Sequence, residues 1–288
     1  MDTLIIGALL GGSYALMAVG LQLQYGVARI MNLASGEILV AGAYGAFWFY
    51  SGYHLSPLIT ALALAPVAFA ANWAIYRLLL LPLVRRAKSE GHLEVDSILA
   101  TFGISFILVG TMLAAFGGEL FSYSYLERPV VIFGETYALN RLVAFLYALA
   151  LSAGLYLWLY RTRTGLTMRA VSVSPGAAGL VGIDVRATSA LAFGLGGAVS
   201  AAGGGLLSTF LPFDPSIGIV FTMKALVVVI LGGVRDIRGS ILAAFILGIT
   251  ETVVSSWIDP GLTLAAAYLL FLLILLFRPQ GLLGRKAG

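Results

Sequence analysis

The chain has 288 residues, of which 60% are hydrophobic and only 10% are charged, and its formal net charge is +4. Soluble globular domains carry about 25% charged residues, so a chain this apolar cannot cover its surface with polar groups. We therefore expect an integral membrane protein that folds as one all-α helical bundle over residues 1–288. Because the chain has no cysteine, disulfides, cysteine-ligated metals and thiol nucleophiles are excluded.

Apolar runs separated by charged connections predict about eight or nine transmembrane helices, since a spanning helix needs about 20 mostly apolar residues. The runs cover residues 3–24, 37–53, 57–81, 97–116, 141–160, 187–210, 216–233, 239–257 and 261–277. The second or the seventh run can instead be a broken or re-entrant helix, which would leave eight full spans. Residues 117–140 are mixed in polarity and long enough for a small surface helix.

The positions of the basic residues predict the orientation of the bundle. If the chain starts outside, 14 of the 17 Lys and Arg residues fall on cytoplasmic connections. Outside there are then only Arg128 and Arg141, as the positive-inside rule requires. We expect the N-terminus outside and the C-terminus in the cytoplasm, with residues 161–186 as the largest cytoplasmic loop.

Catalytic motifs are absent from the sequence. There is no phosphate loop of the form G-x-x-x-x-G-K-[ST], so we do not expect this chain to hydrolyse ATP. The two histidines, His54 and His92, fall on opposite sides of the predicted membrane and cannot form one metal site. We predict no catalytic residue, no metal and no cofactor, and nothing indicates a nucleic-acid partner.

Two charged residues fall at membrane depth, where a charge costs roughly 2.5–3.5 kcal/mol on insertion scales. Lys224 lies in the middle of the run 216–233, and Glu251 lies inside the run 239–257. The two side chains can pair across helices. Either they form an ion pair that fixes packing and register, or they line a transport route or its gate.

The start of the second run also carries polar residues, in the stretch MNLASGE at 31–37. Asn32 or Ser35 can cap the helix, and Glu37 in its first turn complements the helix dipole. A role in a gate or pathway is the alternative interpretation for Asn32 and Glu37.

Within the loop 161–186, Ser174 followed by Pro175 is typical of a helix start, with the serine as cap and the proline in the first position. A short helix over 175–181 is predicted to end at Gly182. We expect small apolar residues to be exposed on it: Ala177, Ala178, Leu180 and Val181. Such a surface, flanked by arginines, either lies at the lipid headgroups or docks on a cytoplasmic partner.

Four stretches, in order along the chain, resemble the permeases of branched-chain amino-acid ABC importers. They are GGSYAL at 11–16 with QYG at 24–26 and MNLASGE at 31–37; MRA at 168–170 with A-x-x-L-x-G-I at 177–183; KA at 224–225 with LGG at 231–233 and GS at 239–240; and RPQGLLG at 278–284. Two departures are Ser35, where many relatives have histidine, and the charged run 234–238. Either departure can reflect another substrate or partner.

The resemblance implies a type II-like ABC importer permease of a bacterial inner membrane, the shorter of two related permeases. Its partners would be a second permease subunit (a paralogue or another copy), two cytoplasmic ATPase subunits, an external substrate-binding protein and membrane lipid. The binding protein would dock on the outer loops around 117–140 and 211–216. The coupling helix in the loop 161–186 would contact the ATPase. The residues expected at that contact are Arg169, Ser174, Pro175, Ala177, Ala178, Leu180, Gly182 and Ile183.

Two alternatives stay open from the sequence. In the first, the same class of permease carries urea, short amides, aromatic acids or sugars, because an external binding protein often sets specificity. In the second, the chain is an ion-coupled secondary transporter or a channel, with Lys224 and Glu251 as an ion or proton relay.

Overall fold

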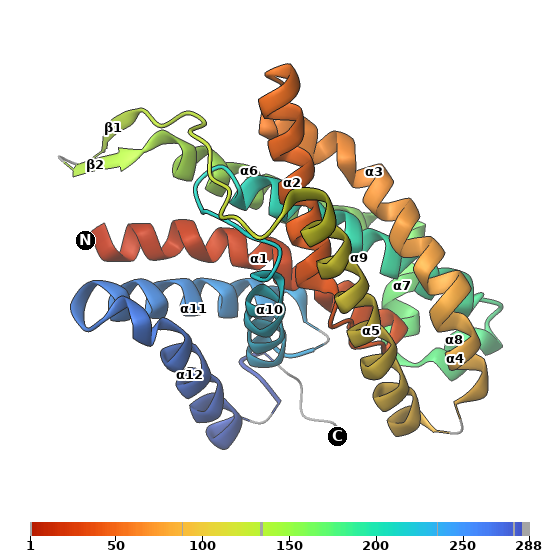
Figure 1. Ribbon diagram of the computed structural model, residues 1–288. Helices are drawn as coiled ribbons and strands as arrows, with labels where there is room; N and C mark the ends of the chain where they lie inside the picture. The colour runs from red at the N-terminus through yellow and green to blue at the C-terminus, as the bar shows by residue number, and fades with distance from the viewer. Residues whose placement is uncertain (1, 88, 133–134, 235, 279, 284–288) are drawn as a thin grey trace.

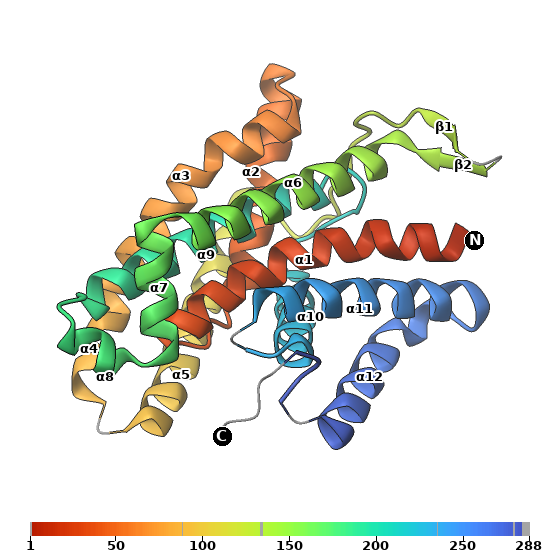
Figure 2. The same ribbon diagram turned by 180° about the vertical axis from the view of Figure 1, so that it is seen from behind.

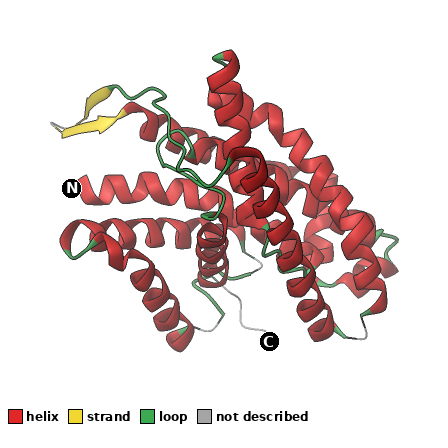
Figure 3. Cartoon of the chain, in the orientation of Figure 1, coloured by secondary structure: helices red, strands yellow, loops and turns green. Residues whose placement is uncertain are grey.

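The computed structural model describes residues 2–87, 89–132, 135–234, 236–278 and 280–283. It is a bundle of helices (Figure 1), and a pair of antiparallel strands stands out among them in Figure 3. The helices in the first half of the chain are α1 (Asp2–Ala28), α2 (Ser35–Tyr53), α3 (Pro57–Ile75), a π-helical turn (Tyr76–Leu80), α4 (Leu81–Arg86), α5 (Glu90–Phe116) and α6 (Leu139–Arg161). Those in the second half are α7 (Arg163–Val173), α8 (Pro175–Leu180), α9 (Val185–Leu207), α10 (Gly218–Gly232), α11 (Ile237–Trp257), a 3-10 turn (Pro260–Leu262) and α12 (Thr263–Phe277).

The centre of the bundle is formed by α1 and α9, and α1 packs against α9 on one side and α11 on another. Within their most apolar stretches, 72% of α1 and 83% of α9 is buried, against 17% of α5 and 6% of α12. All of these helices are apolar, so the exposed ones need a nonpolar solvent around them. The bundle therefore has a buried pair of helices and a rim that faces lipid.

Glycines bring the central helices into backbone contact. A Cβ added at Gly204 of α9 would lie 1.7 Å from the carbonyl oxygen of Leu39 in α2. One added at Gly11 of α1 would lie 2.7 Å from the Cα of Phe245 in α11, and one at Gly248 would lie 2.5 Å from the backbone of Gly7. Small residues permit this approach, which replaces the missing hydrophobic drive between helices in lipid.

The all-helical membrane bundle that the sequence predicts is confirmed. Seven helices among the described residues are long and apolar enough to cross a membrane. The two remaining predicted runs, 37–53 and 216–233, correspond to α2 and α10. These are the two runs for which a broken or re-entrant helix was the alternative. Helix α10 has 15 residues and is about 22 Å long, which is shorter than the hydrocarbon core of a bilayer.

Two connections differ from expectation. The predicted surface helix within 117–140 is wrong, because this segment contains the antiparallel hairpin of β1 (Pro129–Ile132) and β2 (Glu135–Ala138). The stretch PVVI has no helix former and is rich in β-branched residues, which favours a strand. The connection before α5 is shorter than predicted, since the Ser89 side chain caps that helix by accepting from the backbone N–H of His92 at 3.3 Å.

We predict that Gly204→Ala lowers the stability of the bundle by about 1–3 kcal/mol, because the added methyl group forces α9 away from α2. The measurement is the thermal unfolding midpoint in mild detergent. Gly154→Ala in α6 is the matched control, since a Cβ there meets nothing within 4 Å. The control is expected to unfold at an equal or higher temperature, as alanine favours helix. Equal midpoints for both variants would contradict the close contact.

Candidate functional site

A closed triangle of polar side chains lies inside the bundle. The Lys224 ammonium of α10 donates to Glu251 Oε2 of α11 and to the Tyr14 hydroxyl of α1, each at 2.8 Å. The Tyr14 hydroxyl in turn donates to the same Glu251 oxygen at 2.7 Å. The three residues come from three helices, so the triangle joins α1, α10 and α11 at one point.

The triangle is buried but incompletely satisfied. The Lys224 side chain is 12% exposed and that of Glu251 is 4% exposed. Glu251 Oε1 is buried and has no hydrogen-bond partner. The attraction within a buried ion pair offsets the cost of desolvation only when the remaining hydrogen-bonding groups also have partners. Because Glu251 Oε1 has none, part of the desolvation cost of the Lys224–Glu251 pair is not offset.

A second polar cluster surrounds the chain between α1 and α2, which is not helical although Ile30, Asn32 and Ala34 are buried and the other residues are only partly exposed. Thr101 of α5 accepts from the N–H of Leu33 and donates to the carbonyl of Met31, each at 3.1 Å. Asn32 donates to the Gln24 side chain at 2.9 Å. Thr101 lies eleven residues into α5, about 16 Å along its axis. Irregular backbone at that depth is tolerated only where protein groups satisfy it, as they do here.

The first turns of α2 and α10 meet beside this segment. The Thr222 hydroxyl of α10 accepts from the N–H of Gly36 at 2.9 Å and donates to the carbonyl of Leu33 at 3.1 Å. A Cβ at Gly36 would lie 1.8 Å from the carbonyl oxygen of Gly218. From this contact α2 runs to the loop after α5, where Tyr50 donates to the Ser124 carbonyl, while α10 runs the opposite way (Figure 1). We name this crossing, residues 32–37 with 218–222, the α2–α10 junction.

The predicted cap of α2 differs from the structure. Ala34 occupies the N-cap position without a side-chain cap bond, and the Ser35 hydroxyl is buried without a partner. The Asn32 side chain accepts from the N–H of Ala34 at 3.0 Å, which precedes the helix. The N–H of Gly36, in the first turn of α2, is instead bonded by the Thr222 hydroxyl of α10. The first-turn position of Glu37 is confirmed, but its side chain is buried, with Oε2 unpaired.

Aromatic side chains from α2, the end of α5 and the loops after α5 and α9 form a cluster at the far end of α2. The Tyr44 ring stacks on Phe116 with centroids 4.3 Å apart and meets the edge of Phe213 at 5.0 Å. A β-bridge between Phe121 and Phe213 joins the two loops. Burial raises the pKa of Tyr123 to about 12, so its phenol stays neutral and keeps its hydrogen bond with Ser208. The cluster thus closes this end of α2 with aromatic rings.

The loop 161–186 contains the predicted short helix, α8, with the Ser174 side chain accepting from the N–H of Ala177 at 3.3 Å. The helix ends next to Gly182, which has a positive φ of 83°. Leu180 is 90% exposed and Val181 is 76% exposed, as predicted. The prediction for Ala178 is wrong, because this residue is 3% exposed and packs into a cluster with Met168 and Val171 of α7.

The other residues predicted at this contact do not share one surface. Ala177 is exposed on α8, whereas Ser174, Pro175 and Ile183 are only partly exposed. The Arg169 guanidinium lies 4.4 Å from the centroid of the Tyr160 ring in α6. The exposed apolar surface is therefore Ala177, Leu180 and Val181, which we name the α8 patch.

Comparison with known proteins bears on what this arrangement does. The family model described as "Branched-chain amino acid transport system / permease component" matches residues 3–278. The chain belongs to this permease family. The match covers α1 to the end of α12, so both polar clusters and the α8 patch lie inside the family domain.

Relatives align over nearly their whole lengths. The high-affinity branched-chain amino acid permease LivH of Salmonella typhimurium is 27% identical over 97% of this chain and 94% of its own. BraD of Pseudomonas aeruginosa, named for the same transport, is 28% identical over 99% of this chain and 96% of its own. A probable LivH of Methanocaldococcus jannaschii is 29% identical over 84% of this chain and 77% of its own. No solved structure matches the chain.

The structure brings some predicted residues together and separates others. Lys224 and Glu251 form the pair that the sequence allowed, whereas Asn32 and Glu37 lie in the separate α2–α10 junction. Sequence reasoning missed Tyr14 and Thr222. Tyr14 stands in the GGSYAL stretch, and a tyrosine in the middle of an apolar run was the available signal. A threonine in a membrane helix gives no comparable signal.

We predict that Lys224→Met alone lowers the free energy of unfolding by about 3–5 kcal/mol, since it leaves the Glu251 carboxylate buried without its cation. The double variant Lys224→Met with Glu251→Leu is expected to recover much of this loss, because no charge is then left buried. Unfolding in mild detergent of the two single variants and the double variant gives the coupling energy. Additive losses would show that the two side chains do not stabilise one another.

Proposed function

We propose that the chain is a transmembrane permease subunit of an ATP-driven importer for branched-chain or other hydrophobic amino acids in a bacterial inner membrane. The observation that carries the proposal is the family match over residues 3–278, together with relatives named for this transport. The importer would consist of this chain, a second permease, two ATPase subunits that hydrolyse the ATP, and an external substrate-binding protein.

The orientation proposed from the basic residues puts the N-terminus outside and the C-terminus in the cytoplasm. With this orientation, α7 and α8 lie in the cytoplasm, and the hairpin and the aromatic cluster lie outside. Four basic residues used in the orientation argument lie outside the described residues: Lys88, Arg235, Arg285 and Lys286. The outer loops then form the docking surface for the binding protein.

We place the cargo pathway at the α2–α10 junction. Two short helices that start at membrane depth and diverge are the arrangement that transporters use for sites near the bilayer midplane. Glu37 and Asn32 are buried there, and Glu37 Oε2 is an unused acceptor for the ammonium group of an amino acid. In this proposal the triangle of Tyr14, Lys224 and Glu251 is the gate, because it holds α10 to α1 and α11.

The α8 patch is proposed as the surface that docks on an ATPase subunit. Leu180 and Val181 are large, apolar and exposed on the side that is proposed to be cytoplasmic. Exposed apolar residues framed by polar ones are typical of protein interfaces. Ala178 anchors α8 to α7, so a push on the patch would pass to α7 and the helices next to it.

We predict that Leu180→Asp abolishes uptake and stimulation of the ATPase, because it puts a carboxylate into an apolar interface, while the bundle keeps its unfolding temperature. Val95→Asp is the matched control: Val95 is 65% exposed, near the proposed cytoplasmic end of α5 and outside the loop. The control is expected to transport normally. Normal uptake by the Leu180→Asp variant would contradict the proposed coupling role of α8. Ala178→Asp is unsuitable for this purpose, since that side chain is buried.

The composition of the importer is tested by purifying the tagged chain from its native host in mild detergent. We expect two ATPase subunits and a second permease in stoichiometric amounts, identified by mass spectrometry, together with ATP-dependent uptake in liposomes. A chain recovered alone that transports in liposomes without ATP would overturn the proposal and support an ion-coupled secondary transporter. Binding of ligands to the accompanying binding protein would distinguish amino acids from urea, amides, aromatic acids or sugars.

A further inference from the structure

A groove of about 520 Å³ lies between α6 and α11, with α1 as its floor. Figure 2 shows α1 running between these two helices. The floor residues are small, Gly12 and Ala15, and the walls carry Leu149, Ile241 and Phe245. Neither wall belongs to the α2–α10 junction or to the α8 patch. The groove is therefore a separate feature of the membrane surface of the bundle.

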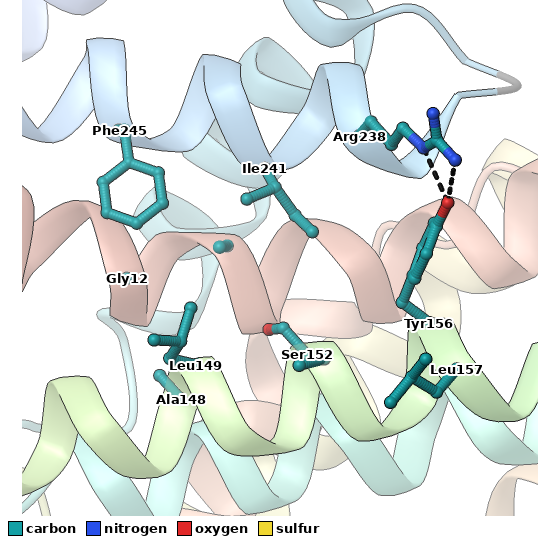
Figure 4. Close-up of a pocket in the computed structure, with 11 residues that line it drawn as sticks. Gly12, Ala148, Leu149, Ser152, Tyr156, Leu157, Arg238, Ile241 and Phe245 are labelled. Carbon is teal, nitrogen blue, oxygen red and sulfur yellow. Dashed lines mark hydrogen bonds between the residues drawn. The ribbon is translucent and has the colours of Figure 1, made fainter.

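The groove is apolar along its length and basic at one end. Arg238 stands at that end, where its Nε donates to the Tyr156 hydroxyl at 2.6 Å and a terminal nitrogen donates to the same oxygen (Figure 4). Its guanidinium lies 5.2 Å from the centroid of the Tyr156 ring. Tyr156 thus holds a cation at the mouth of the groove through its hydroxyl oxygen.

A second guanidinium approaches the same aromatic pair. The rings of Tyr156 and Tyr160 lie 4.4 Å apart, and Tyr160 has Arg169 at 4.4 Å and Arg238 at 5.7 Å from its centroid. Arg169 Nε is buried without a hydrogen-bond partner. Among the described residues neither arginine has a carboxylate within 4.0 Å, so neither guanidinium forms a direct ion pair there.

The dimensions fit one lipid chain in one leaflet. On α11 the groove extends from Arg238 to Phe245, seven helical steps or about 10 Å, and on α6 from Ala148 to Leu157, nine steps or about 13 Å. The hydrocarbon of one leaflet is roughly 15 Å deep. An acyl chain in the groove would therefore bring its headgroup to the level of the two arginines.

We propose that this groove is a binding site for an anionic phospholipid of the cytoplasmic leaflet. The phosphate pairs with Arg238 and Arg169, and one acyl chain lies along α6 and α11 over Gly12 and Ala15. Basic pockets between membrane helices on the cytoplasmic side take anionic headgroups, and among the described residues neither arginine forms an ion pair with a carboxylate. The assignment of the leaflet rests on the orientation proposed above, while the site itself does not depend on the cargo.

The site is tested with the full chain, purified with the subunits that accompany it and placed in vesicles. Half of the vesicles contain phosphatidylglycerol with a photoreactive group near the end of one acyl chain, and half contain phosphatidylcholine with the same group. After illumination, mass spectrometry locates and quantifies the labelled peptides. We expect phosphatidylglycerol to label 148–157 and 241–245 preferentially. Equal labelling by the two lipids would overturn the proposal.

Variants test which residues hold the lipid. Arg238→Gln and Arg169→Gln are each expected to reduce labelling by phosphatidylglycerol about fivefold. Arg238→Lys, which keeps the charge, should retain most of it. Arg77→Gln is the matched control, because Arg77 also lies over an aromatic ring, that of Trp73, but outside the groove. Equal labelling of Arg238→Gln and Arg77→Gln would overturn the role of the arginines.

Two further experiments test the groove itself: a bulky substitution that occupies it, and cross-linking that identifies the molecule bound in it. Ala153 is exposed on the wall, so Ala153→Phe should block labelling without disturbing the interior. Because the chain has no cysteine, Ala153→Cys supplies a unique attachment point for a cross-linker. Cross-links from this position to a second permease would show that protein, and not lipid, fills the groove. None of these readouts uses ATP or cargo, so a failure of the proposed transport function leaves them unaffected.

Discussion

Lipid tails are as apolar as leucine, so helices in a bilayer gain little free energy from hiding apolar side chains from one another. What remains is close packing, and in this protein it depends on direct backbone contact around α1 and α9. Gly11 and Gly248 bring α1 against α11, and Gly204 brings α9 against α2. These contacts also fix where the polar groups lie, because Tyr14 and Glu251 reach each other only with α1 and α11 this close.

The same packing makes the irregular segment between α1 and α2 possible. Its peptide groups have no water at that depth and depend on side chains from neighbouring helices, Thr101 and Thr222 above all. Since Thr222 belongs to α10, the start of α2 is tied to a helix that is almost 190 residues away in the sequence. The junction and the Lys224 triangle both involve α10, so a displacement of this short helix would change both clusters together.

The fold class was predictable because composition and the lengths of the apolar runs decide it, and both are properties of the chain alone. The pairing of Lys224 with Glu251 could also be predicted from the sequence, since each charge at membrane depth needs a counter-charge. The capping of α2 by Thr222 was not, because a threonine in an apolar helix is unremarkable until the helices are placed. The hairpin over 129–138 was missed because its strands are four residues long, too short to show a period. Burial of Ala178 depends on α7, a helix that the loop sequence did not predict.

The contrast between the centre and the rim of the bundle has a consequence for how the sequence can drift. On α12, where 6% of the most apolar stretch is buried, any apolar side chain satisfies the lipid, so leucine, isoleucine and phenylalanine are interchangeable there. On α9, where 83% is buried and glycines touch neighbouring backbones, even a methyl group is too large at several positions. Relatives less than 30% identical over almost their whole length can therefore keep one architecture. Differences can accumulate freely at the rim while steric constraint limits change at the centre.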